Sequence, residues 1–265
     1  MLKLPEFFKP ENKCEMIRLG KKNDGGYTIP KRSLQDTNTL IGFGISDDWS
    51  FEENFFNLSG AKVLCYDYSV NTRFWIVKFL KNLINFIFLK NFLDNFKELT
   101  KYFKYKFFFS KTNISHEKKF IAPLNQKITG VNETSITDLN NIIKSNNLGQ
   151  IFLKVDIEGS EYRILDQILE NQNHFTGTVI EFHDCDLHFD KIDKFIKKFL
   201  LQLVHVHVNN YGAINQFDEP TVIELTFSAK KYNENRELSD NNFPVINLDQ
   251  PNNPNIEDEK IVFRS

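Results

Sequence analysis

Short apolar runs of strand length recur along the chain and alternate with longer stretches in which apolar residues have a helical spacing. Several runs are rich in β-branched or aromatic residues, which is typical of strands covered on both faces. The alternation predicts an α/β fold with a mainly parallel, seven-stranded sheet and helices on both faces. The predicted strands are Leu40–Ile45, Lys62–Tyr68, Lys106–Phe109, Ile151–Ile157, Thr178–Phe182, Val204–Val208 and Val222–Phe227. The predicted helices are Phe51–Leu58, Arg73–Lys101, Ser135–Ser145, Ser160–Asn171 and Asp190–Leu201.

The length of 265 residues and the hydrophobic content of 41% suit one α/β domain. We assign residues 1–230 to that domain and treat the helical stretch at about 73–101 as an insertion in it. From residue 231 to residue 265 the chain is polar and rich in Asn and Pro, which predicts a tail that lies over the surface.

The stretch 73–101 is rich in Phe, Leu and Ile, but Lys78, Lys81, Lys90 and Asp94 interrupt it. Its longest uncharged run is too short to span a bilayer, so a transmembrane helix is excluded. A broad apolar face remains, for which three interpretations stay open: a core or homo-oligomer contact, a lid over an acceptor, or a membrane-surface patch.

Charge and cysteine content restrict the class of protein further. Charged residues make up 26% of the chain and the net charge is −2, so the overall balance shows no nucleic-acid footprint and indicates a small-molecule partner. Cys14, Cys65 and Cys185 are widely spaced and form no CxxC pair, which argues against a disulfide framework or a structural zinc site. Residues 1–10 lack the pattern of a signal peptide. We therefore expect a cytoplasmic protein.

The first predicted strand ends in a glycine turn, Gly42-Phe43-Gly44, and the second ends at Asp67. An acid about 20 residues beyond such a turn is placed to accept hydrogen bonds from the ribose of an adenosyl cofactor. Asp47 and Asp48 stand where a pyrophosphate would lie, and their charges would repel it. The turn therefore favours S-adenosylmethionine over NAD.

Polar residues follow three later strands at the same predicted edge of the sheet. Asp156 and Glu158 end the fourth strand, and either could orient an acceptor, take its proton or bind a metal. A neutral imidazole suits proton removal near neutral pH, so His183 and His207 are the candidate bases. The remaining polar residues at these strand ends are Glu181, Asp184, His205, Asn209 and Asn210.

From Arg18 to Lys230 the sequence resembles the FkbM-type methyltransferase family. The motifs that carry the resemblance are Asp24-Gly25-Gly26-Tyr27, Gly42-Phe43-Gly44, the run from Lys154 to Glu161, the run from His205 to Asn210, and Pro220–Leu225. The resemblance implies a Rossmann-like class I methyltransferase fold, S-adenosylmethionine as methyl donor, and O-methylation of sugars or macrolide-type hydroxyls.

The resemblance also implies roles for individual residues. Cofactor binding falls to Asp24, Gly25, Gly42, Gly44, Ser46 and Asp67, and the catalytic, acceptor-facing residues are Asp156, Glu158, His183 and His207. A divalent ion, Mg²⁺ or Mn²⁺, would be held by Asp156, Asp184 and His183, with Glu181 as a further possible ligand.

The function expected from the sequence is methyl transfer from S-adenosylmethionine to a sugar hydroxyl, in a bacterial enzyme that modifies a nucleotide-linked or capsular sugar. The alternatives are a Rossmann-type NAD-dependent oxidoreductase and a non-catalytic binding module of the same fold. A metal hydrolase built on His205 and His207 is the weakest alternative, because that pair has no third ligand on its strand.

Overall fold

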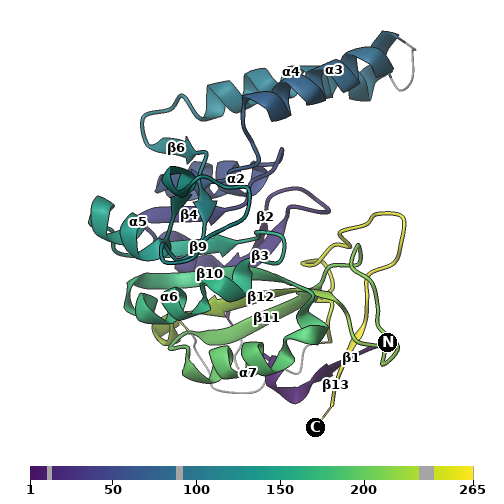
Figure 1. Ribbon diagram of the computed structural model, residues 1–265. Coiled ribbons are helices and arrows are strands. Elements are labelled where there is room, and N and C mark those ends of the chain that lie inside the picture. The colour runs from purple at the N-terminus through teal and green to yellow at the C-terminus, as the bar shows by residue number, and fades with distance from the viewer. Residues whose placement is uncertain (11–13, 88–91, 233–241, 265) are drawn as a thin grey trace.

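A twisted sheet of seven strands forms the centre of the molecule (Figure 1). The computed structural model describes residues 1–10, 14–87, 92–232 and 242–264. The strands lie in the order β11-β12-β10-β9-β4-β5-β6, and every neighbouring pair is parallel except those that β12 makes with β10 and β11. The strand bounds are β4 Thr39–Phe43, β5 Lys62–Tyr66, β6 Ile114–Glu117, β9 Ile151–Val155, β10 Phe175–His183, β11 Gln202–Val208 and β12 Val222–Ser228.

Helices cover both faces of this sheet, because alternate residues of its strands point to opposite sides. In β4, Leu40 belongs to one hydrophobic cluster and Ile41 to the other; in β9, Phe152 and Leu153 divide in the same way. One cluster includes side chains of α5 Leu139–Asn146, α6 Leu165–Glu170 and α7 Phe189–Lys198. The other includes side chains of α1 Lys31–Gln35, α2 Ser50–Ser59, α3 Thr72–Ile87 and α4 Phe92–Phe108.

This strand order, with one antiparallel strand near an edge, is that of the Rossmann-like class I methyltransferase fold, so the predicted fold is confirmed. Smaller pairings surround the sheet: β1 Leu2–Pro5 with β13 Ile261–Arg264, β2 Met16–Leu19 with β3 Tyr27–Pro30, and β7 Phe120–Ile121 with β8 Ile136–Thr137. Short 3-10 helices lie at Glu6–Phe8, Glu133–Ser135, Glu161–Arg163, Gln172–His174, Cys185–Leu187 and Lys230–Tyr232.

The Phe-rich insertion is a hairpin of two helices, α3 and α4, which projects from the sheet (Figure 1). The sequence predicted one helix over 73–101, of which residues 88–91 lie outside the described residues. The predicted strand at Lys106–Phe109 is wrong, because Lys106, Phe107 and Phe108 are the last residues of α4. The third parallel strand is β6, which the sequence analysis did not predict.

The polar C-terminal segment, as far as residues 242–264 are described, packs against the body of the protein. Phe243 belongs to a core cluster, and Asp249 and Asn252 are buried. The last strand, β13, pairs in parallel with β1. Residues 233–241 and 265 of the predicted tail lie outside the described residues. The burial of these polar side chains was not predicted from composition.

The turn after β4 lies directly against the end of β9. Gly44 has φ +77°, and a Cβ there would lie 1.6 Å from the carbonyl oxygen of Asp156. Backbone hydrogen bonds from Asp156 to Phe43 and from Gly44 to Tyr66 join this turn to both neighbouring strands. Glycine is therefore required here by the packing of two strand ends, independently of any ligand.

Replacing Gly44 by Ala should lower the free energy of unfolding by about 3 kcal/mol, since backbone strain and a steric clash add together. Gly60 is the matched control, because its φ is +68° but nothing lies within 4 Å of an added Cβ. Gly60→Ala should cost only about 1 kcal/mol. Urea denaturation of both variants measures the difference, and equal losses would contradict the packing argument.

Candidate active site

Two adjoining cavities lie where β4, β5, β9 and β10 end, the edge at which ligands of such sheets bind. The larger has a volume of about 510 Å³ and the smaller about 230 Å³. Ser46, Asp156 and Glu158 line both cavities, so the two cavities are adjacent. Asp67 and Asp156 both line the smaller cavity, as the sequence analysis required.

Asp67 closes one side of the smaller cavity and organises the glycine turn. Its Oδ2 accepts hydrogen bonds from the backbone N–H groups of Ile45 (3.0 Å) and Ser46 (2.9 Å). Its Oδ1 accepts from the backbone N–H (2.8 Å) and the hydroxyl (2.6 Å) of Ser69. Burial alone would raise the pKa of Asp67, but these hydrogen bonds lower it below the ordinary value. Asp67 is thus ionised.

The other residues predicted to bind the cofactor divide between the two cavities. Ser46 lines both, Gly44 lines the smaller, and Asp24 and Gly25 line the larger. Gly42 lines neither; a Cβ at this position would lie 3.0 Å from the buried carboxylate of Glu52. Gly42 therefore makes room for a protein side chain.

The two acids after the glycine turn are paired with lysines. Asp47 forms ion pairs with Lys78 and, at 2.7 Å, with Lys101, while Asp48 lies 2.8 Å from Lys21. Their charges are therefore partly compensated, which weakens the electrostatic argument from the sequence against a dinucleotide.

Tyr27 joins two carboxyl groups at the floor of the larger cavity. The hairpin of β2 and β3 places its hydroxyl 2.9 Å from Asp156 Oδ2 and 3.0 Å from Glu181 Oε2. Asn209 donates to the other oxygen of Glu181 at 2.9 Å. Burial, followed by the charges of Asp156 and Glu224, raises the pKa of Glu181 well above its ordinary value. The sequence analysis identified Tyr27 only as part of a turn motif.

Glu52 and Lys154 form a buried pair under the glycine turn, and Glu52 is the residue of this site that the sequence analysis missed. The Lys154 ammonium donates to the carbonyl of Gly44 (2.5 Å) and lies 4.0 Å from Glu52. Neither oxygen of Glu52 has a hydrogen-bond partner among the described residues. Burial raises the pKa of Glu52 to about 7, although the Lys154 charge opposes this. Glu52 stands in the first turn of α2, and nothing in its sequence position indicated that it would be buried.

His183 points into the larger cavity and is held by Glu161. Its Nδ1 lies 3.2 Å from Glu161 Oε1, which also accepts from the backbone N–H groups of Ile157 and Gly159. Its Nε2 lies 3.4 Å from Glu158. Burial alone would lower the pKa of His183, but Glu161, Glu181 and Asp156 outweigh burial and raise it to about 9.

Asp156, Glu158 and His183 can each offer one ligand atom within 4.8 Å of the others, which suits a divalent cation. The bond to Glu161 orients the imidazole, as the outer partners of metal-bound histidines do. Asp184, the third ligand expected from the sequence, is exposed and does not belong to this group. Glu158 stands in its place.

His207, expected as a catalytic base, does not line either cavity. Its side chain is buried, with Nδ1 at 3.3 Å from Glu224 and Nε2 at 3.1 Å from Asp258. Burial alone would lower the pKa of His207, but the two carboxylates raise it to about 10. A buried imidazolium with both nitrogens engaged cannot accept a proton from a substrate. His205 is likewise buried, against Asp249 at 3.1 Å.

No family model and no curated protein matches the sequence. Among solved structures, the chain is similar to an rRNA methylase from Streptococcus thermophilus, with 10% identity over 75% of this chain and 91% of that chain and a TM-score of 0.40. Fibrillarin from Methanococcus jannaschii, a pre-rRNA processing protein, has 10% identity over 75% of this chain and 69% of that chain, with a TM-score of 0.38. A protein of Pyrococcus horikoshii described as an RNA methyltransferase has 10% identity over 74% of this chain and 76% of that chain, with a TM-score of 0.36. These values are too low to support an inference about activity or substrate.

The pair of His207 with Glu224 and Asp258 should make the stability of the protein depend on pH. The folded pKa of about 10 lies above the value of about 6.5 in the unfolded chain, so the stabilisation is complete below about pH 6.5. It is lost as the pH rises through about 10. Between pH 7 and pH 10, the free energy of unfolding of the wild-type protein should fall by at least about 2 kcal/mol more than that of His207→Asn. The reason is that each unit of pKa shift is worth about 1.4 kcal/mol.

Urea denaturation across this pH range measures how steeply the free energy of unfolding falls with pH in the wild-type protein and in His207→Asn. His174→Asn is the matched control, because His174 is exposed and should leave the wild-type slope unchanged. A His207→Asn slope as steep as that of wild type would show that the pair is not charged in the folded protein.

Proposed function

We propose that this protein is an S-adenosylmethionine-dependent O-methyltransferase that acts on a hydroxyl group of a sugar, either nucleotide-linked or part of a surface polysaccharide. The observation that carries the proposal is the pair of cavities that share Ser46, Asp156 and Glu158. One cavity adjoins the glycine turn and Asp67, and the other is lined mainly by polar side chains. Methyl transfer needs two ligands in contact, with the reacting atoms aligned.

The smaller cavity suits the adenosyl part of the cofactor. Asp67 remains ionised and can accept a hydrogen bond from a ribose hydroxyl. The turn at Gly44 lets the backbone lie close to a ligand in this cavity. When bound, S-adenosylmethionine supplies an electrophilic methyl group on its sulfonium. The chain itself supplies the position of that group, beside the shared wall at Asp156.

The larger cavity suits an acceptor with several hydroxyl groups. Its lining includes carboxyl groups, an amide, an imidazole and a phenol: Asp156, Glu158, Glu181, Asn209, His183 and Tyr27. Each hydroxyl of a sugar can find a partner there, so its removal from water is compensated. An apolar acceptor would remove water from the half-buried Asp156 and the exposed Glu158 without replacing its hydrogen bonds, which costs binding energy.

Proton removal from the acceptor falls to the groups around His183. We assign Asp156, Glu158 and His183 as the site of a divalent cation, with Mn²⁺ favoured over Mg²⁺ because one ligand is an imidazole. When bound, the cation would lower the pKa of an acceptor hydroxyl. Asp156 is held in place by Tyr27 and Lys154, and His183 by Glu161. His207 has no part in this proposal.

Cofactor choice is tested by thermal unfolding with S-adenosylhomocysteine and, separately, with NAD. S-adenosylhomocysteine should stabilise the protein by about 2.7 kcal/mol at 100 times its Kd, and NAD should not. In Asp67→Asn the affinity should fall by about 10- to 100-fold, since a hydrogen bond to a charged group is lost. Stabilisation by NAD alone would favour an oxidoreductase instead.

Activity is tested by incubating nucleotide sugars with the protein and S-adenosylmethionine and looking for a mass gain of one CH₂ unit. A binding module would bind S-adenosylhomocysteine and give no mass gain with any acceptor.

The cation site is tested by titrating Mn²⁺ and measuring free Mn²⁺ by electron paramagnetic resonance, which does not depend on turnover. Glu161→Gln should weaken Mn²⁺ binding by about 10- to 100-fold through loss of the group that orients His183. Glu158→Gln should weaken it at least as much, whereas Asp184→Asn should leave it unchanged. Loss of binding in Asp184→Asn but not in Glu158→Gln would restore the ligand set expected from the sequence.

A further inference from the structure

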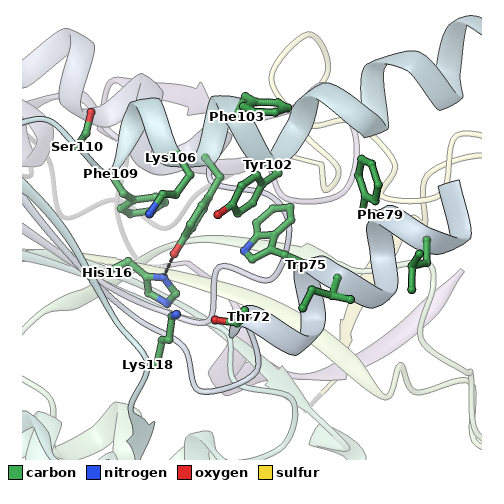
Figure 2. A pocket seen from close by; sticks show the side chains of 13 residues that line it. Thr72, Trp75, Phe79, Tyr102, Phe103, Lys106, Phe109, Ser110, His116 and Lys118 are labelled. Carbon is green, nitrogen blue, oxygen red and sulfur yellow. Dashed lines mark hydrogen bonds between the residues drawn. The ribbon is translucent and has the colours of Figure 1, made fainter. Parts of the chain in front are cut away.

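The largest described cavity, about 770 Å³, lies along the helical hairpin and shares no lining residue with the two cavities of the candidate site. Trp75, Phe79 and Leu80 of α3 line it on one side, and Tyr102 and Phe103 of α4 on the other. Figure 2 shows Trp75, Phe79 and Tyr102 lying across the space between the two helices. We call this surface the hairpin groove.

The hairpin groove and its surroundings expose large apolar side chains. Phe79 is 46% exposed and Leu80 51%, and on α4 Phe103 is 69% and Phe107 72% exposed. Isolated exposed apolar residues are ordinary, but a contiguous group of this kind marks an interaction surface. Because the hairpin projects from the sheet, this surface can meet a large partner without hindrance from the rest of the molecule (Figure 1).

The charge of the hairpin indicates the chemistry of the partner that this surface would bind. From residue 72 to residue 111 the sequence has nine Lys or Arg residues and two acidic ones, a net charge of +7. The whole chain has a net charge of −2, so the remainder carries −9. Lys106 and Lys118 line the hairpin groove beside the aromatic residues, and both are exposed. The net charge of the whole chain is therefore close to zero because a strongly basic hairpin and an acidic remainder offset each other.

We propose that the hairpin groove binds the surface of an anionic phospholipid bilayer. Aromatic and aliphatic side chains would enter the headgroup region while lysines contact lipid phosphates, as in other basic amphipathic helices. A second copy of the chain fits less well, because a symmetric dimer would bring two basic hairpins together. The contact is with the bilayer surface, since no helix among the described residues is long and apolar enough to cross it.

The acidic body supports a definite orientation on the membrane. An anionic surface attracts the hairpin and repels the remainder of the chain, so the protein would bind by the hairpin alone. This proposal does not rest on methyl transfer, and it stands or falls independently of the candidate active site.

The test is co-sedimentation of the full chain with vesicles of phosphatidylglycerol and phosphatidylcholine, compared with vesicles of phosphatidylcholine alone. The wild-type protein should bind the anionic vesicles. It should dissociate from them when the salt concentration is raised from about 0.1 M to about 1 M, because the Debye length then falls from about 10 to about 3 Å. Lys106→Glu/Lys118→Glu should lower the partition coefficient by at least about 25-fold, roughly fivefold for each lysine.

Matched controls separate the hairpin from general effects of charge and hydrophobicity. Lys194→Glu/Lys198→Glu on α7 changes the net charge equally and should not lower binding, since both residues are exposed and lie on another element. Phe79→Ser/Phe103→Ser should lower the partition coefficient by about tenfold or more, and Phe217→Ser, at a 59% exposed side chain elsewhere, should not. Circular dichroism would establish that each variant is folded.

Five results would overturn the proposal. Four of these are no binding of wild type to anionic vesicles, equal binding to neutral vesicles, equal losses in the control variants, and a dimer in analytical ultracentrifugation that the Phe79→Ser/Phe103→Ser change dissociates. Binding of the hairpin to single-stranded RNA in preference to anionic vesicles would overturn it as well.

Discussion

The ammonium group of Lys154 connects most of the parts on which the candidate site depends. It donates to the carbonyl of Gly44, lies 3.4 Å from Asp156 and 4.0 Å from Glu52, and stands over the ring of Tyr27. Burial alone would lower the pKa of Lys154, but the two carboxylates raise it, so the charge is retained. A buried charge without partners costs several kcal/mol, which is why this one is surrounded by acceptors. One side chain therefore connects the glycine turn, the end of β9 and the start of α2, and it also lines the larger cavity.

The strands were predictable because both faces of the sheet are buried, and a buried parallel strand leaves an apolar run such as Ile151–Leu153. The polar residue after each run was predictable for the same reason, and Asp67, Asp156 and His183 do lie at one edge. The third strand was misplaced because Lys106–Phe109 is as apolar as a strand, although Tyr105 and Phe108 face the core with helical spacing while Phe107 is exposed. β6 itself has only one buried residue, Ile114, and so lacks the apolar run that the prediction relied on.

The roles of individual polar residues were harder to predict, because they depend on which distant segment covers them. Alternation along β11 placed His205 and His207 on one side, but whether that side faces a cavity or protein depends on residues more than forty positions away. Asp249 and Asp258 come from a segment whose composition suggested only a surface tail. Local sequence shows the direction of a side chain on a strand, but it does not show its partner. Glu52 was missed for the same reason, because its environment is created by Gly42 and Lys154 on two other elements.

The hairpin and the candidate site are not independent parts of the fold. Lys101 of α4 pairs with Asp47, which lines the larger cavity. Tyr105, also on α4, bonds to His116 at 2.5 Å, and His116 bonds through its other nitrogen to the backbone carbonyl of Asp67. A shift of α4 on a surface would therefore act on one residue of each cavity through contacts that are already formed. Asp47 forms ion pairs with Lys78 and Lys101, so the lysines of the hairpin contribute to the position of that carboxylate. The hairpin therefore carries two sets of lysines: Lys78 and Lys101 pair with Asp47 at the candidate site, whereas Lys106 lines the hairpin groove.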